Sequence, residues 1–285
     1  MKLTHILIAA GCMAAAHSAH ASEKYRSIAE LQENGSISVQ ILSTGGYSGN
    51  CVNLQMKNNR SDTQFVWIEA GRRLDNPVET DQDILLVREE KIALPPFAKT
   101  QRLLFGFCCQ ASNGAPKTDT TFRIGSMAGG NLEWLAGFID HKKYDTYTIQ
   151  QAVWVFSDNH QLASVVAGRD PLIIDLRKAM AKKLNITLPW YDIQYRTVDN
   201  TPFSGQHTRV TGEIEFSSAS AGFLSINIRN EVGMLMHVVT EEENALYGST
   251  YTVPLNIPVE HWGKGRYSVN VYIDGNLKKK QEFVL

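Results

Sequence analysis

The chain has 285 residues with 28 basic and 29 acidic side chains, and its formal net charge at pH 7 is −1. This near-balance gives no electrostatic reason to expect nucleic acid or an anionic lipid surface as a partner. After the first residues, no segment approaches the run of about 20 apolar residues that a membrane-spanning helix needs. The length fits two ordinary domains of roughly 100–150 residues each.

The N-terminus has the three parts of an export signal. Lys2 supplies the positive charge, residues 3–16 form a short apolar stretch, and Ala19-His20-Ala21 gives the small-x-small cleavage pattern. We therefore predict a signal peptide over residues 1–21 and an exported protein. Its location is the cell surface, the outer membrane or the exterior, with the periplasm left open. Cys12 ends a poor lipoprotein motif, and whether it is lipidated stays open.

Three cysteines remain after export, namely Cys51, Cys108 and Cys109. An odd number of cysteines in an oxidising compartment means that at least one sulfur has no intramolecular disulfide partner. Cys51 can pair with either of the two adjacent cysteines, and the sequence does not choose between them.

The N-terminal half has the alternating pattern of half-buried strands. Strands are predicted at residues 36–42, 51–56, 65–71, 83–88 and 92–94. Short strands at this spacing favour a sandwich over alternating βαβ units.

Helices are predicted after Pro116. Leu132, Leu135, Ala136 and Ile139 keep helical spacing, and so do Ile149, Ala152, Val153 and Phe156, with a loop around residues 141–143 between the two sets. A third helix has the clearest ends, because Asp170 is a good N-cap, Pro171 suits the first helical position and Asn185 can close it.

Strands resume in the last part of the chain. Residues 211–216, 222–228, 235–239, 251–257 and 266–273 are separated by turn residues, and Asp274-Gly275 predicts a hairpin to a last strand over 280–285. We predict a mainly β fold with inserted helices: a β-rich domain over 22–187, a connector over 188–212, and an Ig-like β-sandwich over 213–285.

The sequence carries no established catalytic or metal-binding signature. Its five histidines after the signal are not at metal-ligand spacing, so we expect no metal, no cofactor and no enzymatic activity. A thiol-dependent hydrolase, with His141 or His160 as the base, is the weakest of the functions considered.

One pair of motifs resembles a known family. Phe107-Cys108-Cys109 and the later Thr148-Ile149-Gln150-Gln151-Ala152-Val153-Trp154 resemble the bacterial surface thioester domains, whose signature is an aromatic-Cys pair and a T-Q-x-A-aliphatic-W segment. Cys109 is an unexpected neighbour, and Ile149 stands where Thr is usual.

The resemblance implies a thioester between a cysteine and the side chain of Gln150, with Cys108 and Cys109 as candidates, that a host amine can open. Cys51 would then form a disulfide with the adjacent cysteine that does not react. If Cys108 forms the thioester, the disulfide candidates are Cys51 and Cys109. The competing interpretation is structural: Ile149, Val153 and Trp154 are core residues, and one of the adjacent cysteines is a buried, inert thiol.

A second resemblance covers the last quarter. Residues 224–228, Asn230-Glu231-Val232-Gly233, Gly265-Arg266-Tyr267 and the lysine-bearing end are similar to the hook-cap Ig-like domain and to the C-terminal sorting domains of the type IX secretion system. This resemblance implies outer-membrane secretion machinery as a partner.

We therefore predict a secreted or cell-surface binding or adhesion protein, whose partner is an extracellular protein or a surface glycan and not a nucleic acid. The alternative is a structural or assembly component of the cell envelope without covalent chemistry.

Overall fold

The computed structural model describes residues 24–198 and 202–285. The predicted signal peptide and Cys12 lie outside these residues. The predicted fold class is confirmed, because the chain is mainly β with inserted helices. Across the two described ranges, no helix has the length and apolar character that a membrane crossing requires.

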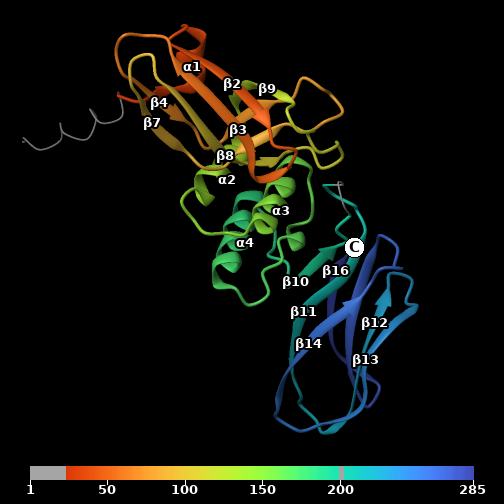
Figure 1. Ribbon diagram of the computed structural model, residues 1–285. Helices are drawn as coiled ribbons and strands as arrows, with labels where there is room; N and C mark the ends of the chain where they lie inside the picture. The colour runs from red at the N-terminus through yellow and green to blue at the C-terminus, as the bar shows by residue number, and fades with distance from the viewer. Residues whose placement is uncertain (1–23, 199–201) are drawn as a thin grey trace, which may run out of the picture.

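The N-terminal strands close into a barrel (Figure 1). Its order is β2 (Ile37–Ser43), β3 (Ser48–Asn58), β8 (Lys99–Cys108), β6 (Ile84–Leu86), β5 (Arg72–Asp75) and β9 (Thr121–Met127). A small sheet of β1 (Arg26–Ser27), β4 (Gln64–Ile68) and β7 (Glu90–Leu94) lies beside it with helix α1 (Ile28–Glu33). The predicted sandwich is therefore wrong for this half, since β5, β8 and β9 supply the strands that close the sheet on itself.

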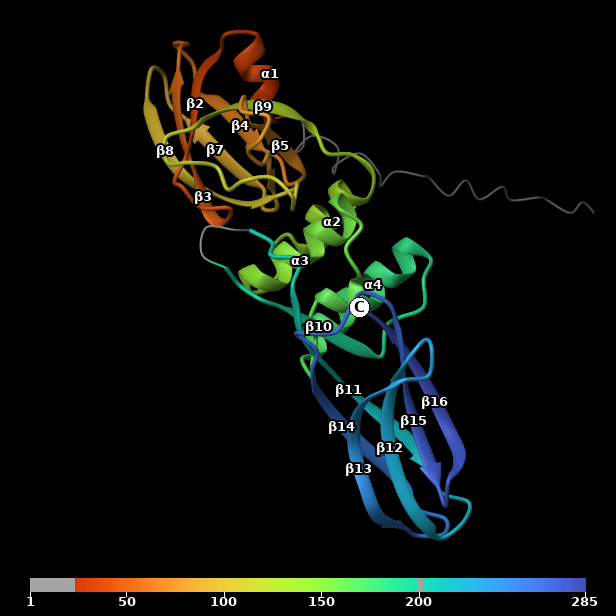
Figure 2. The ribbon, with the colours of Figure 1, turned by 90° about the vertical axis from the view of Figure 1, so that its right-hand side faces the viewer.

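The predicted helices are confirmed as α2 (Gly130–Ile139), α3 (Thr146–Ser157) and α4 (Pro171–Leu184), with a 3₁₀ turn η1 (Leu162–Ser164) between the last two. The side chain of Asp170 accepts the N–H of Leu172, and Asn185 ends α4 in the left-handed conformation. The three helices lie between the barrel and the C-terminal strands (Figure 2). Their apolar side chains share one core with Phe107 of β8.

The C-terminal part is a two-sheet sandwich. One sheet is β10 (Tyr191–Tyr195), β11 (His207–Ser217) and β14 (Thr250–Pro258). The other is β13 (Leu235–Ala245), β12 (Gly222–Asn230), β15 (Arg266–Ile273) and β16 (Asn276–Val284). Residues 188–212, which the sequence predicts as a connector, include β10 and the first part of β11. The alternation is weak there because Tyr191, Asp192 and Ile193 are all buried.

A buried ion pair ties the helices to the sandwich. The guanidinium of Arg177 on α4 contacts the carboxylate of Asp192 on β10, and both side chains are less than a tenth exposed. Arg177 also donates to the carbonyls of Pro189 and Tyr191, each at 3.0 Å. The same Asp192 carboxylate accepts the N–H groups of Ala167 and Gly168. These bonds fix α4 and the segment before it against the first strand of the sandwich.

Candidate functional site

The two adjacent cysteines lie at the end of β8 and face opposite sides of the barrel wall. Successive side chains on a strand point to opposite faces. Cys108 is fully buried in the barrel core, together with Cys51. Cys109 packs on the other side, against the core that contains Ile149 and Val153 of α3. Only Cys109 therefore has its side chain on the helical side.

Gln150 lies near the start of α3. The helix begins after Asp145, whose carboxylate accepts the N–H of Thr148 at 2.8 Å and its hydroxyl at 2.6 Å. Gln150 is 3% exposed, and its Nε2 donates to the carbonyl oxygen of Cys108 at 2.7 Å. Its Oε1 is buried and has no hydrogen-bond partner in the described part of the chain. The fold thus brings Gln150 to the peptide that joins Cys108 and Cys109.

Cys51 belongs to the barrel interior. Its thiol donates to the carbonyl oxygen of Gly106 at 3.3 Å, and its sulfur is 3.5 Å from the position that a Cβ of Gly106 would take. Cys51, Cys108 and Cys109 are all free thiols, so the described residues contain no disulfide. The two pairings that the sequence leaves open for Cys51, with Cys108 or with Cys109, are both absent from the described residues, and the side chains of Cys51 and Cys109 lie on opposite sides of the wall.

All three thiols are held in the protonated form. Burial raises the pKa of Cys51 to about 12. Burial also raises the pKa of Cys109 to about 12; nearby Asp83 adds to this effect and Arg73 opposes it. The pKa of Cys108 is raised as well, first by burial and then by its proximity to Cys51 and Cys109. Because the thiolate is the nucleophile, the resting site holds no activated sulfur.

A polar network fixes the chain beside Cys109. The side chain of Gln110 donates to the carboxylate of Asp83 at 2.8 Å, and the N–H of Asp83 donates back to it at 2.7 Å. Arg73 bonds the same carboxylate at 3.1 Å. The sequence reasoning missed Asp83 and Gln110, and the only available signal was a polar residue directly after a buried cysteine pair.

Neither candidate base is bonded to a sulfur. The side chain of His141 is three-quarters exposed and contacts Asp140. His160 is half-buried, its pKa is lowered by burial against the opposing effect of Asp158, and its ring lies against Phe203. Within 24–198 and 202–285, the hydrogen bonds of Cys51 and Cys109 go to main-chain carbonyls. A thiol-dependent hydrolase therefore has no geometric support.

A cavity of about 140 Å³ lies next to Gln150. Gln150, Gln151 and Trp154 of α3 border it, together with Tyr47 from the barrel and Tyr195 and Phe203 from the sandwich side. The Oε1 atoms of both glutamines and Nε1 of Trp154 are buried without a hydrogen-bond partner in the described ranges.

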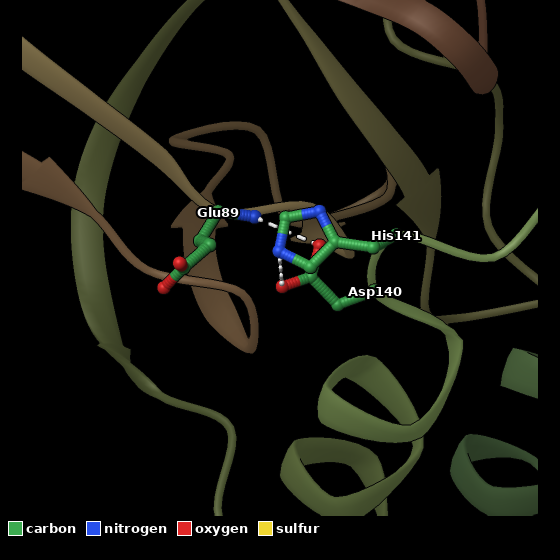
Figure 3. Close-up of side chains that lie close together, drawn as sticks. All are labelled: Glu89, Asp140 and His141. Atoms are coloured by element: carbon green, nitrogen blue, oxygen red, sulfur yellow. Dashed lines mark hydrogen bonds and ion pairs between the residues drawn. The ribbon is translucent and has the colours of Figure 1, made fainter.

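Glu89, Asp140 and His141 bring two carboxylates and an imidazole together (Figure 3). The carboxylate of Glu89 already accepts from Lys91 at 3.0 Å and from the indole of Trp67 at 2.9 Å. Asp140 accepts the main-chain N–H of Glu89 at 3.4 Å and lies 3.3 Å from the ring of His141. The Lys91 ammonium group already occupies the Glu89 carboxylate, and hydrogen bonds account for the other contacts of the cluster. We therefore assign it no metal.

No protein-family model matches the chain, and no curated protein matches its sequence.

Proposed function

We propose that this chain is an exported binding protein that attaches covalently to its partner through an internal thioester between a cysteine and Gln150. The observation that carries the proposal is the buried side chain of Gln150, bonded at 2.7 Å to the main chain of Cys108. Two residues that are 42 positions apart in the sequence meet there through the Gln150 amide and the main-chain oxygen of Cys108, and both side chains are shielded from water.

Thioester formation exchanges one bond for another. The sulfur attacks Cδ of Gln150, the S–C bond forms, the C–Nε2 bond breaks, and the thiol proton leaves with the nitrogen as ammonia. An amide is a poor electrophile, so the reaction depends on holding the two groups in contact without water. The full burial of Gln150, Ala152 and Trp154 supplies a dry contact of this kind.

Cys109 is the first candidate for the reacting sulfur. Its side chain packs on the side of the wall where α3 lies, whereas the side chain of Cys108 lies in the barrel core. The motif resemblance places the reacting sulfur at Cys108 instead. Both cysteines are therefore tested separately.

Intact mass spectrometry of the exported protein tests the proposal. The thioester makes the chain lighter by one ammonia, and methylamine opens it to give N-methylglutamine and a free thiol. We expect this mass loss in the wild-type chain and in the matched Cys51→Ser variant, and none in Gln150→Ala. Loss of the signature in Cys109→Ser but not in Cys108→Ser identifies the reacting sulfur. A wild-type mass equal to that of the unreacted chain contradicts the proposal.

The partner is a protein with an accessible lysine or a glycan with a free amino group, because the acyl carbon must be attacked by an amine.

A second proposal concerns the C-terminal sandwich. We propose that outer-membrane secretion machinery recognises this part of the chain. Its support is the sequence resemblance, and export of a chain that ends before β10 tests it.

A structural envelope component without covalent chemistry is the second candidate. The protonation of all three thiols favours it, since no sulfur is activated at rest. The mass measurement above separates the two.

A further inference from the structure

Three polar atoms at the cavity beside Gln150 have no explained role. Gln150, Gln151 and Trp154 are 3%, 4% and 1% exposed, and each carries a buried polar atom with no hydrogen-bond partner among residues 24–198 and 202–285. Buried polar groups are nearly always hydrogen-bonded, because an unpaired one loses its contacts with water and gains none. Two carbonyl oxygens and one indole N–H at the same cavity therefore point to an occupant.

The helix places these groups together. Residues three and four positions apart are neighbours on a helix surface, so Trp154 lies one turn beyond Gln150 and Gln151. The rest of the lining is mixed. Tyr47, Tyr147, Tyr195 and Phe203 are aromatic, and Phe203 packs on Trp154 at 5.6 Å between ring centroids. Polar side chains complete the lining: Ser48, Thr146, Arg196, Thr197 and Ser204. The cavity thus combines two unpaired acceptors and one unpaired donor with walls that are partly aromatic and partly polar.

We propose that this cavity is the route by which the amine reaches the thioester, and that Gln151 and Trp154 act on the reaction. This inference rests on the proposed function. Oε1 of Gln151 accepts an N–H of the incoming amine. Nε1 of Trp154 donates to the former Gln150 oxygen as negative charge develops on it, where an oriented donor stabilises the transition state.

The step is balanced without another reagent. The amine nitrogen forms a bond to Cδ of residue 150, the C–S bond breaks, and the proton lost by the nitrogen passes to the departing sulfur. A volume of about 140 Å³ is enough for the alkyl chain of one small amine. An unbranched and a branched amine of the same formula have nearly the same volume, so the preference we expect for an unbranched primary amine, such as a lysine side chain, comes from the shape of the route that Gln151 and Trp154 line.

The test measures how fast amines open the thioester, followed by intact mass. Gln151→Leu removes the acceptor, and Trp154→Phe removes the N–H but keeps an aromatic ring. We expect both variants to lose ammonia and to react with methylamine more slowly, by roughly tenfold or more. Gln101→Leu on the barrel exterior and Trp134→Phe on α2 are the matched controls and are expected to react at the wild-type rate. n-Butylamine is expected to exceed tert-butylamine by a larger rate ratio in the folded wild-type chain than with a small alkyl thioester in solution, where tert-butylamine is already the more hindered nucleophile.

The outcomes separate this inference from the function on which it rests. If the wild-type chain never loses ammonia, both are wrong. If it loses ammonia but Gln151→Leu and Trp154→Phe react at the wild-type rate, only the inference is overturned. If Trp154→Phe fails to form the thioester, two other comparisons decide. The inference is overturned when Gln151→Leu reacts with methylamine at the wild-type rate and the ratio of the two butylamine rates equals that of a small thioester in solution.

Discussion

The side-chain amide of Gln150 has a hydrogen-bonded nitrogen and an oxygen without a hydrogen-bond partner in the described chain. Its N–H₂ is bonded to a carbonyl, while its oxygen is buried. Leaving such an oxygen without a partner costs roughly 1–3 kcal/mol. Burial also raises the pKa of the Cys51 and Cys109 thiols and so keeps them protonated.

The raised thiol pKa values predict a loss of stability in alkaline solution. Cys51 has a folded pKa of about 12 against an ordinary value of 9.0, so the unfolded chain releases this proton first as the pH rises. The stabilisation is complete below about pH 9 and is lost as the pH rises toward 12, at up to about 1.4 kcal/mol per pH unit for each thiol. Urea unfolding in a reducing buffer between pH 7 and 10.5 measures the decline. Cys51→Ser should give a shallower decline, and an identical slope in both proteins would contradict this origin.

At the scale of elements, the buried ion pair between α4 and β10 carries the largest expected effect on stability. Breaking a buried pair leaves one charge without its partner and typically costs about 3–5 kcal/mol. We expect Arg177→Ala to lower the free energy of unfolding by about 3 kcal/mol, because Asp192 then keeps only main-chain partners.

Arg169→Ala is the matched control for this prediction. The guanidinium of Arg169 bonds Glu213 on the surface, with 89% of the side chain exposed, and surface pairs contribute about 0–1 kcal/mol. Urea unfolding of both variants measures the difference. Equal losses would mean that the contact between α4 and β10 is not stabilised by the buried pair.

The helices could be predicted from the sequence more completely than the strands. Asp170, Pro171 and Asn185 mark both ends of α4, and the observed caps use the same residues. By contrast, β5 has four residues and its two buried positions hold Arg72 and Leu74, and the second half of β8 is buried on both sides. Neither strand therefore shows a clean alternation of apolar and polar residues in the sequence. The barrel was missed for this reason, since closure depends on the pairing of β9 with β2 and β5 and on the pairing of β8 with β3 and β6, which no local pattern encodes.

The candidate site was predicted only in part. The motif pair pointed to Cys108, Cys109 and Gln150, and these lie together in the fold. The side of the wall that each sulfur faces depends on the pairing of β3 with β8, which contains a register shift between Gly49 and Val52. Trp154 looked like an ordinary core residue and Gln151 had no predicted role, because an unpaired polar atom is visible only once its surroundings are known.

At the scale of the whole molecule, three parts of the chain contribute side chains to the cavity beside Gln150. Tyr47 comes from the barrel, Trp154 from the helices and Phe203 from the segment that leads into β11. The ring of Phe203 lies 4.2 Å from that of His160 and 4.9 Å from that of Tyr195, between centroids. The sandwich side therefore closes the wall over the part of the chain that we propose to be reactive.

Removing that ring should expose the thioester to water. We expect Phe203→Ala to lose ammonia as the wild type does, and then to regain mass by hydrolysis several-fold faster, since less apolar surface excludes water from the acyl carbon. A time course of intact mass at neutral pH measures the rate. Phe223→Ala, which truncates an exposed ring on β12, is the matched control. Equal hydrolysis rates in the two variants would argue against a shielding role for Phe203.

The wall of the barrel separates two neighbours that are chemically identical in the sequence. The Cys108 sulfur lies in an interior with no exposed surface, while Cys109 keeps part of its surface outside it. Cys109 lies on the helical side and Cys108 lies behind the sheet, so an alkylating reagent or an oxidant that approaches from the helices reaches Cys109 first. A single peptide bond thus joins a partly exposed residue with a protonated thiol to one that the closed barrel isolates from solvent.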